Sequence, residues 1–174
     1  QVYEKLKTDG LLQTVSAVKS KLDQPISLGY CNAGEIIESS IPGINKGDRV
    51  ASNGPHSEIV RVSKNLCAKI PANVDNETAS FTVLGSIALQ GVRLLNPTIG
   101  ETIAIQGLGL VGLLAVQILK ANGCRVIGID YNRSRCEIAK NYGAEIVGLS
   151  NRFDPISFSN NITHENGIDG VLVC

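Results

Sequence analysis

The residues best suited to chemistry lie in a glycine-rich stretch of the 174-residue chain. Gly107, Gly109 and Gly112 form a G-x-G-x-x-G pattern between an apolar run at 103–105 and a long apolar segment that begins at residue 110. A strand, this loop and a helix in that order are typical of a dinucleotide-binding turn. We expect Gly107 to allow a tight turn, Gly109 to let a diphosphate approach the backbone, and Gly112 to let the helix pack closely.

The start of the following helix supplies hydrogen-bond donors. The first N–H groups of a helix have no acceptor within the helix, and the helix dipole adds positive potential there. We therefore predict that the N–H groups of Leu110 and Val111 donate to the phosphates of a dinucleotide.

An acid follows the next apolar run, 125–129. Asp130 lies 18 residues after Gly112, close to the spacing of about 20 expected of a ribose-binding acid. A carboxylate accepts hydrogen bonds from ribose hydroxyls and repels a 2′-phosphate, so NAD is favoured over NADP. Arg135 could support this acid, although Arg133 and Arg135 keep NADP open. The alternative role of Asp130 is an N-cap for the next helix.

Composition narrows the class of protein. The chain is 43% hydrophobic and 18% charged with no net charge, which is typical of a globular protein and gives no argument for a nucleic-acid partner. The sequence contains no membrane-spanning run and no signal-peptide pattern, so we expect a cytoplasmic location and no membrane partner. Five cysteines without a C-x-x-C pair predict reduced thiols. The sequence contains no Met and stops within an apolar run, so we expect it to be a piece of a longer protein.

The pattern along the chain predicts three parts. Residues 1–27 have helical spacing with a break at 9–10, and residues 28–75 predict a small antiparallel β unit with strands at 33–38, 48–52 and 57–62. Residues 76–174 predict an α/β domain with a Rossmann-type parallel sheet that is truncated after its fourth strand, in the order 3-2-1-4. Its helices are expected at 77–95 (capped by Asp75 or Asn76), 110–121, 134–142 and 154–165, and its strands at 103–105, 125–130, 144–149 and 169–174.

Several of these pieces together resemble the medium-chain dehydrogenase/reductase superfamily, the zinc-type alcohol-dehydrogenase-like proteins. They are the segments 47–50, 56–62 and 70–71, a helix with Gly85 and Gly91, the glycine loop and Asp130. The resemblance implies a GroES-like β domain, here partial, followed by a Rossmann domain. It also implies hydride transfer between NAD(P) and an alcohol or carbonyl compound.

The zinc chemistry of that superfamily does not carry over to this sequence. Tyr30 occupies the position of the zinc-binding His, and the later Cys ligand falls on Thr82. A catalytic zinc needs three protein ligands, and the nearby Cys31 and His56 sit in no ligand motif. The segment that holds a structural zinc is also absent. We therefore expect no zinc.

Finer details resemble the dehydrogenase half of two-domain oxidoreductases from polysaccharide biosynthesis. Segments 5–12, 22–30, 52–56 and 65–71 carry this resemblance. It implies a sugar or nucleotide-sugar substrate, and either a homo-oligomer or a fused second oxidoreductase domain as partner.

The leading hypothesis is a zinc-independent NAD(P)-dependent oxidoreductase acting on the alcohol or carbonyl group of a small molecule. The resemblance places Thr82 and Ser86 on the nicotinamide side, with helix packing as the alternative. His56, Tyr30 and Cys31 are weak candidates for a proton donor. Two other hypotheses remain: a non-catalytic NAD-binding module of a larger protein, and an S-adenosylmethionine methyltransferase, which the upstream β unit disfavours.

Overall fold

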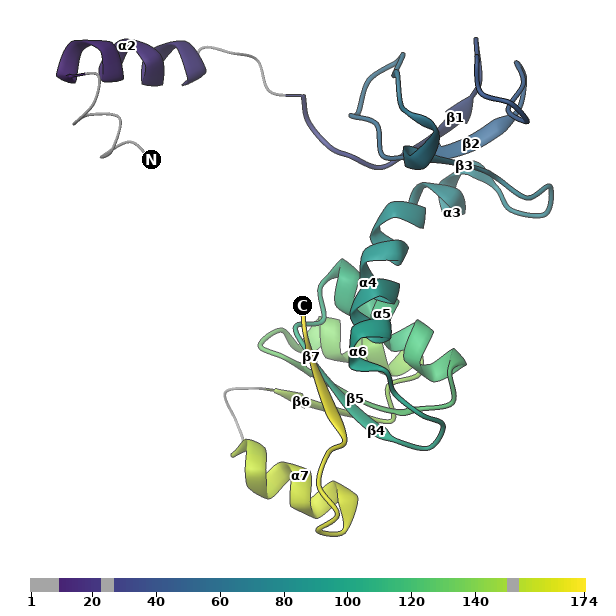
Figure 1. Ribbon diagram of the computed structural model, residues 1–174. Coiled ribbons are helices and arrows are strands. Elements are labelled where there is room, and N and C mark those ends of the chain that lie inside the picture. The colour runs from purple at the N-terminus through teal and green to yellow at the C-terminus, as the bar shows by residue number, and fades with distance from the viewer. Residues whose placement is uncertain (1–9, 23–26, 150–153) are drawn as a thin grey trace.

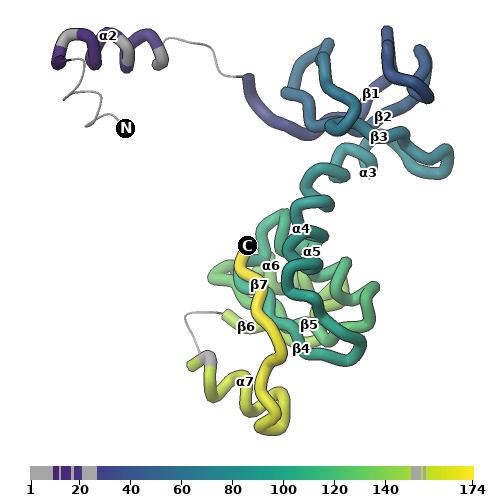
Figure 2. The backbone as a smooth tube through the Cα atoms, in the orientation of Figure 1, coloured from purple at the N-terminus to yellow at the C-terminus, as the bar shows by residue number. Residues whose placement is uncertain are grey.

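The computed structural model describes residues 10–22, 27–149 and 154–174, which form two separate sheets (Figure 1). One sheet has three antiparallel strands, and the other has four parallel strands. Figure 2 follows the backbone from the first sheet through the helices α3 (Asn76–Ser80) and α4 (Thr82–Leu95) into the second. The glycine loop belongs to the parallel sheet.

The parallel sheet confirms the predicted strand order. Its strands are β4 (Thr102–Gln106), β5 (Arg125–Asp130), β6 (Ile146–Leu149) and β7 (Gly170–Val173). They lie in the order β6-β5-β4-β7, which is 3-2-1-4 when counted along the chain. Strands buried on both faces read as continuous apolar runs, and β4 has four consecutive buried residues. The α/β fold with a Rossmann-type sheet is therefore confirmed.

Helices cover the two faces of this sheet unequally. The helices α4 (Thr82–Leu95), α5 (Leu110–Ala121) and α6 (Arg133–Asn141) lie on one side, and α7 (Pro155–Thr163) lies on the other (Figure 1). The core between the sheet and α4–α6 contains side chains with at most 1% exposure: Ile103, Ile105, Val116, Leu119 and Val126. Burying each such side chain stabilises the fold by about 1.5–3 kcal/mol. This core fixes where α5 begins relative to the end of β4.

The three-stranded sheet corrects one predicted strand. Its strands are β1 (Asn32–Glu35), β2 (Arg49–Ser52) and β3 (Cys67–Lys69), with a short 3-10 helix η1 (Lys64–Leu66) before β3. The predicted strand at 57–62 is wrong. That segment is not paired, and Ile59 is 70% exposed. Instead, β3 pairs with β2 through Val50↔Lys69 and Ser52↔Cys67, so backbone pairing rather than apolar alternation decides the third strand.

The predicted helix at 77–95 is divided in two. The helix α3 (Asn76–Ser80) ends at Phe81, and α4 begins at Thr82. Asp75 caps α3, since its Oδ1 accepts a hydrogen bond from Thr78 N at 2.7 Å. Arg49 ties β2 to α3 by donating to the Val74 carbonyl and to Asn76 Oδ1. The β unit is thus anchored directly to the helix pair that leads into the parallel sheet.

The N-terminal helix α2 (Leu11–Leu22) confirms helical structure in part of the first predicted segment. Residues 1–9 of that segment, and residues 23–26, lie outside the described residues. The apolar side chains of Leu11 and Val15 are exposed. Within the described part of the chain, no helix is long and apolar enough to cross a bilayer.

Candidate functional site

The first glycine of the loop sits where two neighbouring strands end. Gly107 has φ +96°, a left-handed conformation that glycine adopts without strain. Its N–H donates to the Ile129 carbonyl at 2.8 Å. A Cβ at this position would lie 2.3 Å from the carbonyl oxygen of Cys174, the residue that follows β7. Both the turn and the close contact therefore require glycine here.

The other two glycines differ in what surrounds them. A Cβ on Gly112 would lie 2.0 Å from the Gly107 carbonyl oxygen, so the first turn of α5 packs against the loop itself. A Cβ on Gly109 would meet no atom within 4 Å. Gly112 is thus required by packing inside the protein, whereas Gly109 borders open space.

The N-terminus of α5 has no side-chain cap. Gly109 occupies the N-cap position and offers no acceptor. By contrast, Asp75, Asn132 and Asp154 accept from backbone N–H groups at the starts of α3, α6 and α7. The first N–H groups of a helix have no acceptor within it. The Leu110 and Val111 N–H groups therefore begin α5 beside open space, with the positive end of the dipole.

Asp130 is directed at the glycine loop and is 7% exposed. Its Oδ2 accepts from Leu108 N at 2.7 Å, and its Oδ1 accepts from Asn132 N at 2.8 Å. Each carboxylate oxygen therefore already accepts a hydrogen bond from a backbone N–H group. Asp130 does not cap α6. Asn132 does, through Oδ1 and Ser134 N at 2.9 Å, which makes the alternative role of Asp130 wrong.

The charge of Asp130 is stabilised in place. Burial alone raises the pKa of its carboxyl group, but the N–H groups of Asn132 and Leu108 and the Arg135 guanidinium together hold that pKa below its usual value. Arg135 Nη1 lies 3.8 Å from Asp130 Oδ2. Asp130 is therefore ionised at neutral pH and can accept hydrogen bonds.

Thr82 and Ser86 lie on the first two turns of α4 and line a cavity of about 210 Å³. Their hydroxyls donate to helix carbonyls: Thr82 Oγ1 to Ala79 O at 2.6 Å, and Ser86 Oγ to Val83 O at 2.7 Å. These bonds agree with the packing interpretation of both residues, whereas their placement on the nicotinamide side stays a prediction. Thr82 also lines a larger cavity, of about 780 Å³, together with Leu110 of α5.

The structure places His56 against Leu28 and Gly29, and its described residues provide no ligand set for zinc. A Cβ on Gly29 would lie within 2.4 Å of the His56 ring, and His56 N donates to Leu28 O at 2.7 Å. Tyr30 is half exposed. Among residues 10–22, 27–149 and 154–174, no group of three His, Cys, Asp or Glu side chains could hold a metal ion. These residues do not fit a catalytic zinc, which needs three protein ligands.

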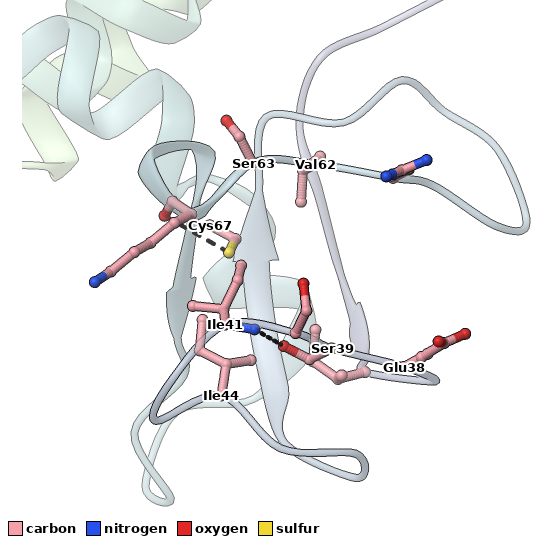
Figure 3. Close-up of a pocket in the computed structure, with 11 residues that line it drawn as sticks. Glu38, Ser39, Ile41, Ile44, Val62, Ser63 and Cys67 are labelled. Carbon is pink, nitrogen blue, oxygen red and sulfur yellow. Dashed lines mark hydrogen bonds between the residues drawn. The ribbon is translucent and has the colours of Figure 1, made fainter.

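A further cavity, of about 540 Å³, lies on the β unit alone (Figure 3). Its polar groups are partly used locally, since Ser39 Oγ accepts from Ile41 N at 3.0 Å and the Cys67 thiol points to Lys64 O. All of its lining residues fall between Ile36 and Cys67. It therefore does not adjoin the glycine loop.

Sequence reasoning missed two residues of the smaller cavity, Asn53 and Asn65. Asn53 follows β2 and Asn65 lies in η1, and Asn53 N donates to Leu66 O at 2.9 Å. This backbone contact brings Asn53 beside η1, the segment that contains Asn65. No motif in the sequence indicates it, because it depends on the unpredicted pairing of β2 with β3.

The family comparison agrees with this geometry. Residues 111–174 match the model of the family described as zinc-binding dehydrogenase. This part of the chain is a domain of the alcohol-dehydrogenase-like, medium-chain dehydrogenase superfamily.

Particular relatives cover more of the chain. Over 124 residues it is 35% identical to a D-guloside 3-dehydrogenase of Escherichia coli, an alignment that covers 68% of this chain and 35% of that protein. Escherichia coli quinone oxidoreductase complexed with NADPH has a TM-score of 0.71 at 26% identity, over 88% of this chain and 51% of that one. Galactitol-1-phosphate dehydrogenase from Escherichia coli shares the fold alone, with a TM-score of 0.76 at 22% identity, over 86% and 53%. The chain thus spans about a third to a half of these proteins.

Proposed function

We propose that this protein is a zinc-independent, NAD-dependent oxidoreductase that acts on an alcohol or carbonyl group of a sugar or nucleotide sugar. One observation carries the proposal. The N-terminus of α5 has no cap and borders open space at Gly109, and an ionised acid stands beside it. In many proteins, an uncapped helix N-terminus of this kind binds an anion such as a phosphate.

The residues of the loop fit a dinucleotide. The N–H groups of Leu110 and Val111 would hold its diphosphate, and the Asp130 carboxylate would accept from the ribose hydroxyls. A 2′-phosphate would meet the Asp130 carboxylate, which favours NAD over NADP. The exposed Arg135 is the group that would reduce this preference, since its guanidinium lies beside the acid.

Catalysis would require a substrate close to α4. The nicotinamide ring supplies hydride chemistry when bound. Thr82 supports this placement, because it borders both the cavity that reaches Leu110 and the smaller cavity of the β unit. Among the described residues that line the smaller cavity, none is an acid or a histidine that could transfer the proton. His56 and Tyr30 are the candidates, and both are exposed.

The substrate class is suggested by a relative. The name of D-guloside 3-dehydrogenase describes a sugar derivative as the compound oxidised. A role in polysaccharide biosynthesis, a cytoplasmic location, and a homo-oligomer or fused second domain belong to the same proposal.

Calorimetric titration of the purified protein with NAD, NADP and S-adenosylmethionine tests the proposal. We expect NAD to bind most tightly. Tighter binding of NADP would remove the role given to Asp130, and binding of S-adenosylmethionine alone would indicate a methyltransferase. X-ray fluorescence tests the metal, and stoichiometric zinc would contradict the zinc-independent assignment.

A second candidate is a non-catalytic NAD-binding module. It is favoured by the hydroxyls of Thr82 and Ser86, whose protons are both donated to helix carbonyls. NAD binding without any NAD-dependent oxidation of a panel of sugars and polyols would support it.

A further inference from the structure

The smaller cavity combines polar side chains of two kinds. Asn53 and Asn65 contribute carboxamides from the β unit, and Thr82 and Ser86 contribute hydroxyls from α4. We call this cavity, which these four residues help to line, the amide–hydroxyl cavity. Its volume, about 210 Å³, is below the roughly 300–1,000 Å³ typical of sites for drug-sized ligands. It therefore has room for one small ring.

The hydrogen-bonding capacity of this cavity is defined by what its hydroxyls already do. A hydroxyl has one donor and two acceptor positions. Thr82 and Ser86 spend their donors on the Ala79 and Val83 carbonyls, so they present only acceptors to a ligand. The carboxamides of Asn53 and Asn65 present donors as well as acceptors. A matching ligand must therefore both donate and accept, as a group of sugar hydroxyls does.

The cavity also lacks charge. Among the described residues that line it, none is Asp, Glu, Lys, Arg or His. The oxygens of a phosphate or carboxylate would face the lone pairs of Thr82 and Ser86, and only the carboxamides of Asn53 and Asn65 could donate to them, with no cation beside them. The other cavity of the β unit differs, because Glu38, Arg61 and Lys64 line it.

We propose that the amide–hydroxyl cavity binds an uncharged, polyhydroxylated ring, and that Asn53 and Asn65 select it over phosphorylated or carboxylated sugars. This rests on the proposed function for the identity of the reaction, but the binding site itself is defined by the four side chains. Asn53 and Asn65 are specificity-determining residues here.

Saturation-transfer NMR with methyl α-D-glucopyranoside, glucose 6-phosphate and glucuronate tests the proposal on the whole chain, without cofactor and with saturating NADH. We expect the neutral glycoside to bind, and Asn53→Leu and Asn65→Leu each to weaken it about five- to tenfold, the loss of one hydrogen bond. Asn73→Leu is the matched control, because Asn73 is exposed outside this cavity. It should leave glycoside binding unchanged.

Separate outcomes distinguish this proposal from the proposed function. Tighter binding of the phosphate or carboxylate, no binding of the glycoside in either condition, or equal binding by wild type and both leucine variants would overturn it. Calorimetry with NAD on the same samples decides the proposed function independently. Circular dichroism of each variant identifies any loss of folding, and Asn53→Gln and Asn65→Gln, which keep the amide, should restore part of the affinity.

Discussion

The starts of α5 and α6 lie close together in the same α/β unit, yet they are built in opposite ways. Asn132 closes the start of α6 with its own side chain, while Gly109 leaves the start of α5 without an acceptor. A cap contributes about 1 kcal/mol of stability. Of these two helices, α6 has this stabilising cap and α5 does not. We infer that the open end is kept for a ligand rather than for folding.

The largest expected effect comes from adding a side chain at Gly112, where the first turn of α5 touches the glycine loop. In Gly112→Ala the new Cβ would overlap the Gly107 carbonyl, so we expect a loss of about 3 kcal/mol in the free energy of unfolding, together with loss of NAD binding. Gly85 is the matched control. It is also a helical glycine, but a Cβ there meets nothing within 4 Å, so Gly85→Ala should stabilise by up to about 1 kcal/mol. Equal urea-unfolding midpoints for both variants would contradict this difference.

A side-chain cap introduced at the start of α5 should weaken NAD binding and raise the free energy of unfolding. Gly109 has φ −70° and ψ −169°, which other residues adopt freely, so Gly109→Asp should fold. Its carboxylate would occupy the amides and repel a diphosphate. We expect NAD to bind about a hundredfold more weakly, and stability to rise by about 0.5 kcal/mol. Calorimetry and urea unfolding measure the two effects. Unchanged NAD affinity would show that the open end is not the binding site.

Asp130 should make stability depend on acid pH. Its folded pKa lies below the unfolded value of about 3.9, so its contribution is present above that value and is lost as the pH falls through the folded pKa. Asp130→Asn should remove this component of the decline between pH 5 and pH 2. Identical pH profiles of unfolding for wild type and variant would contradict the assignment.

The smallest effect is expected at the closed helix. Asn132→Ala removes the cap on Ser134 N but keeps the backbone N–H that donates to Asp130. Stability should fall by about 1 kcal/mol, while NAD affinity stays within about twofold of wild type. Asp154→Ala at the start of α7 should likewise lower the melting temperature without affecting NAD. A large loss of NAD affinity in Asn132→Ala would mean that the two helix ends do not act separately.

The parallel sheet was predictable because its signals are local. Buried parallel strands form continuous apolar runs, and glycines mark the turns between them, so the strand order followed from alternation of strand and helix. The roles of the glycines and Asp130 as cofactor ligands stay predictions. The hydrogen bonds that the Leu108 and Asn132 N–H groups donate to Asp130 could not be predicted. The Leu108 N–H reaches the carboxylate only in the folded loop.

The β unit was harder to predict for a physical reason. Residues 57–62 show apolar alternation but remain unpaired, whereas Cys67–Lys69 carries no clear pattern and pairs with β2. An antiparallel strand this short is selected by its partner rather than by its own side chains. The break at Phe81 was missed similarly, because the helical periodicity continues through it without Gly or Pro.

The contact between Gly107 and Cys174 links the beginning of the glycine loop to β7, a strand much later in the sequence. Cys174 N donates to Gln106 O at 2.9 Å, and its carbonyl fills the space where a side chain at 107 would stand. The loop is thus packed against a segment 67 residues later in the chain. We expect a ligand that binds the loop to stabilise the docking of β7 as well, and slower amide exchange along β7 on ligand addition would report this coupling.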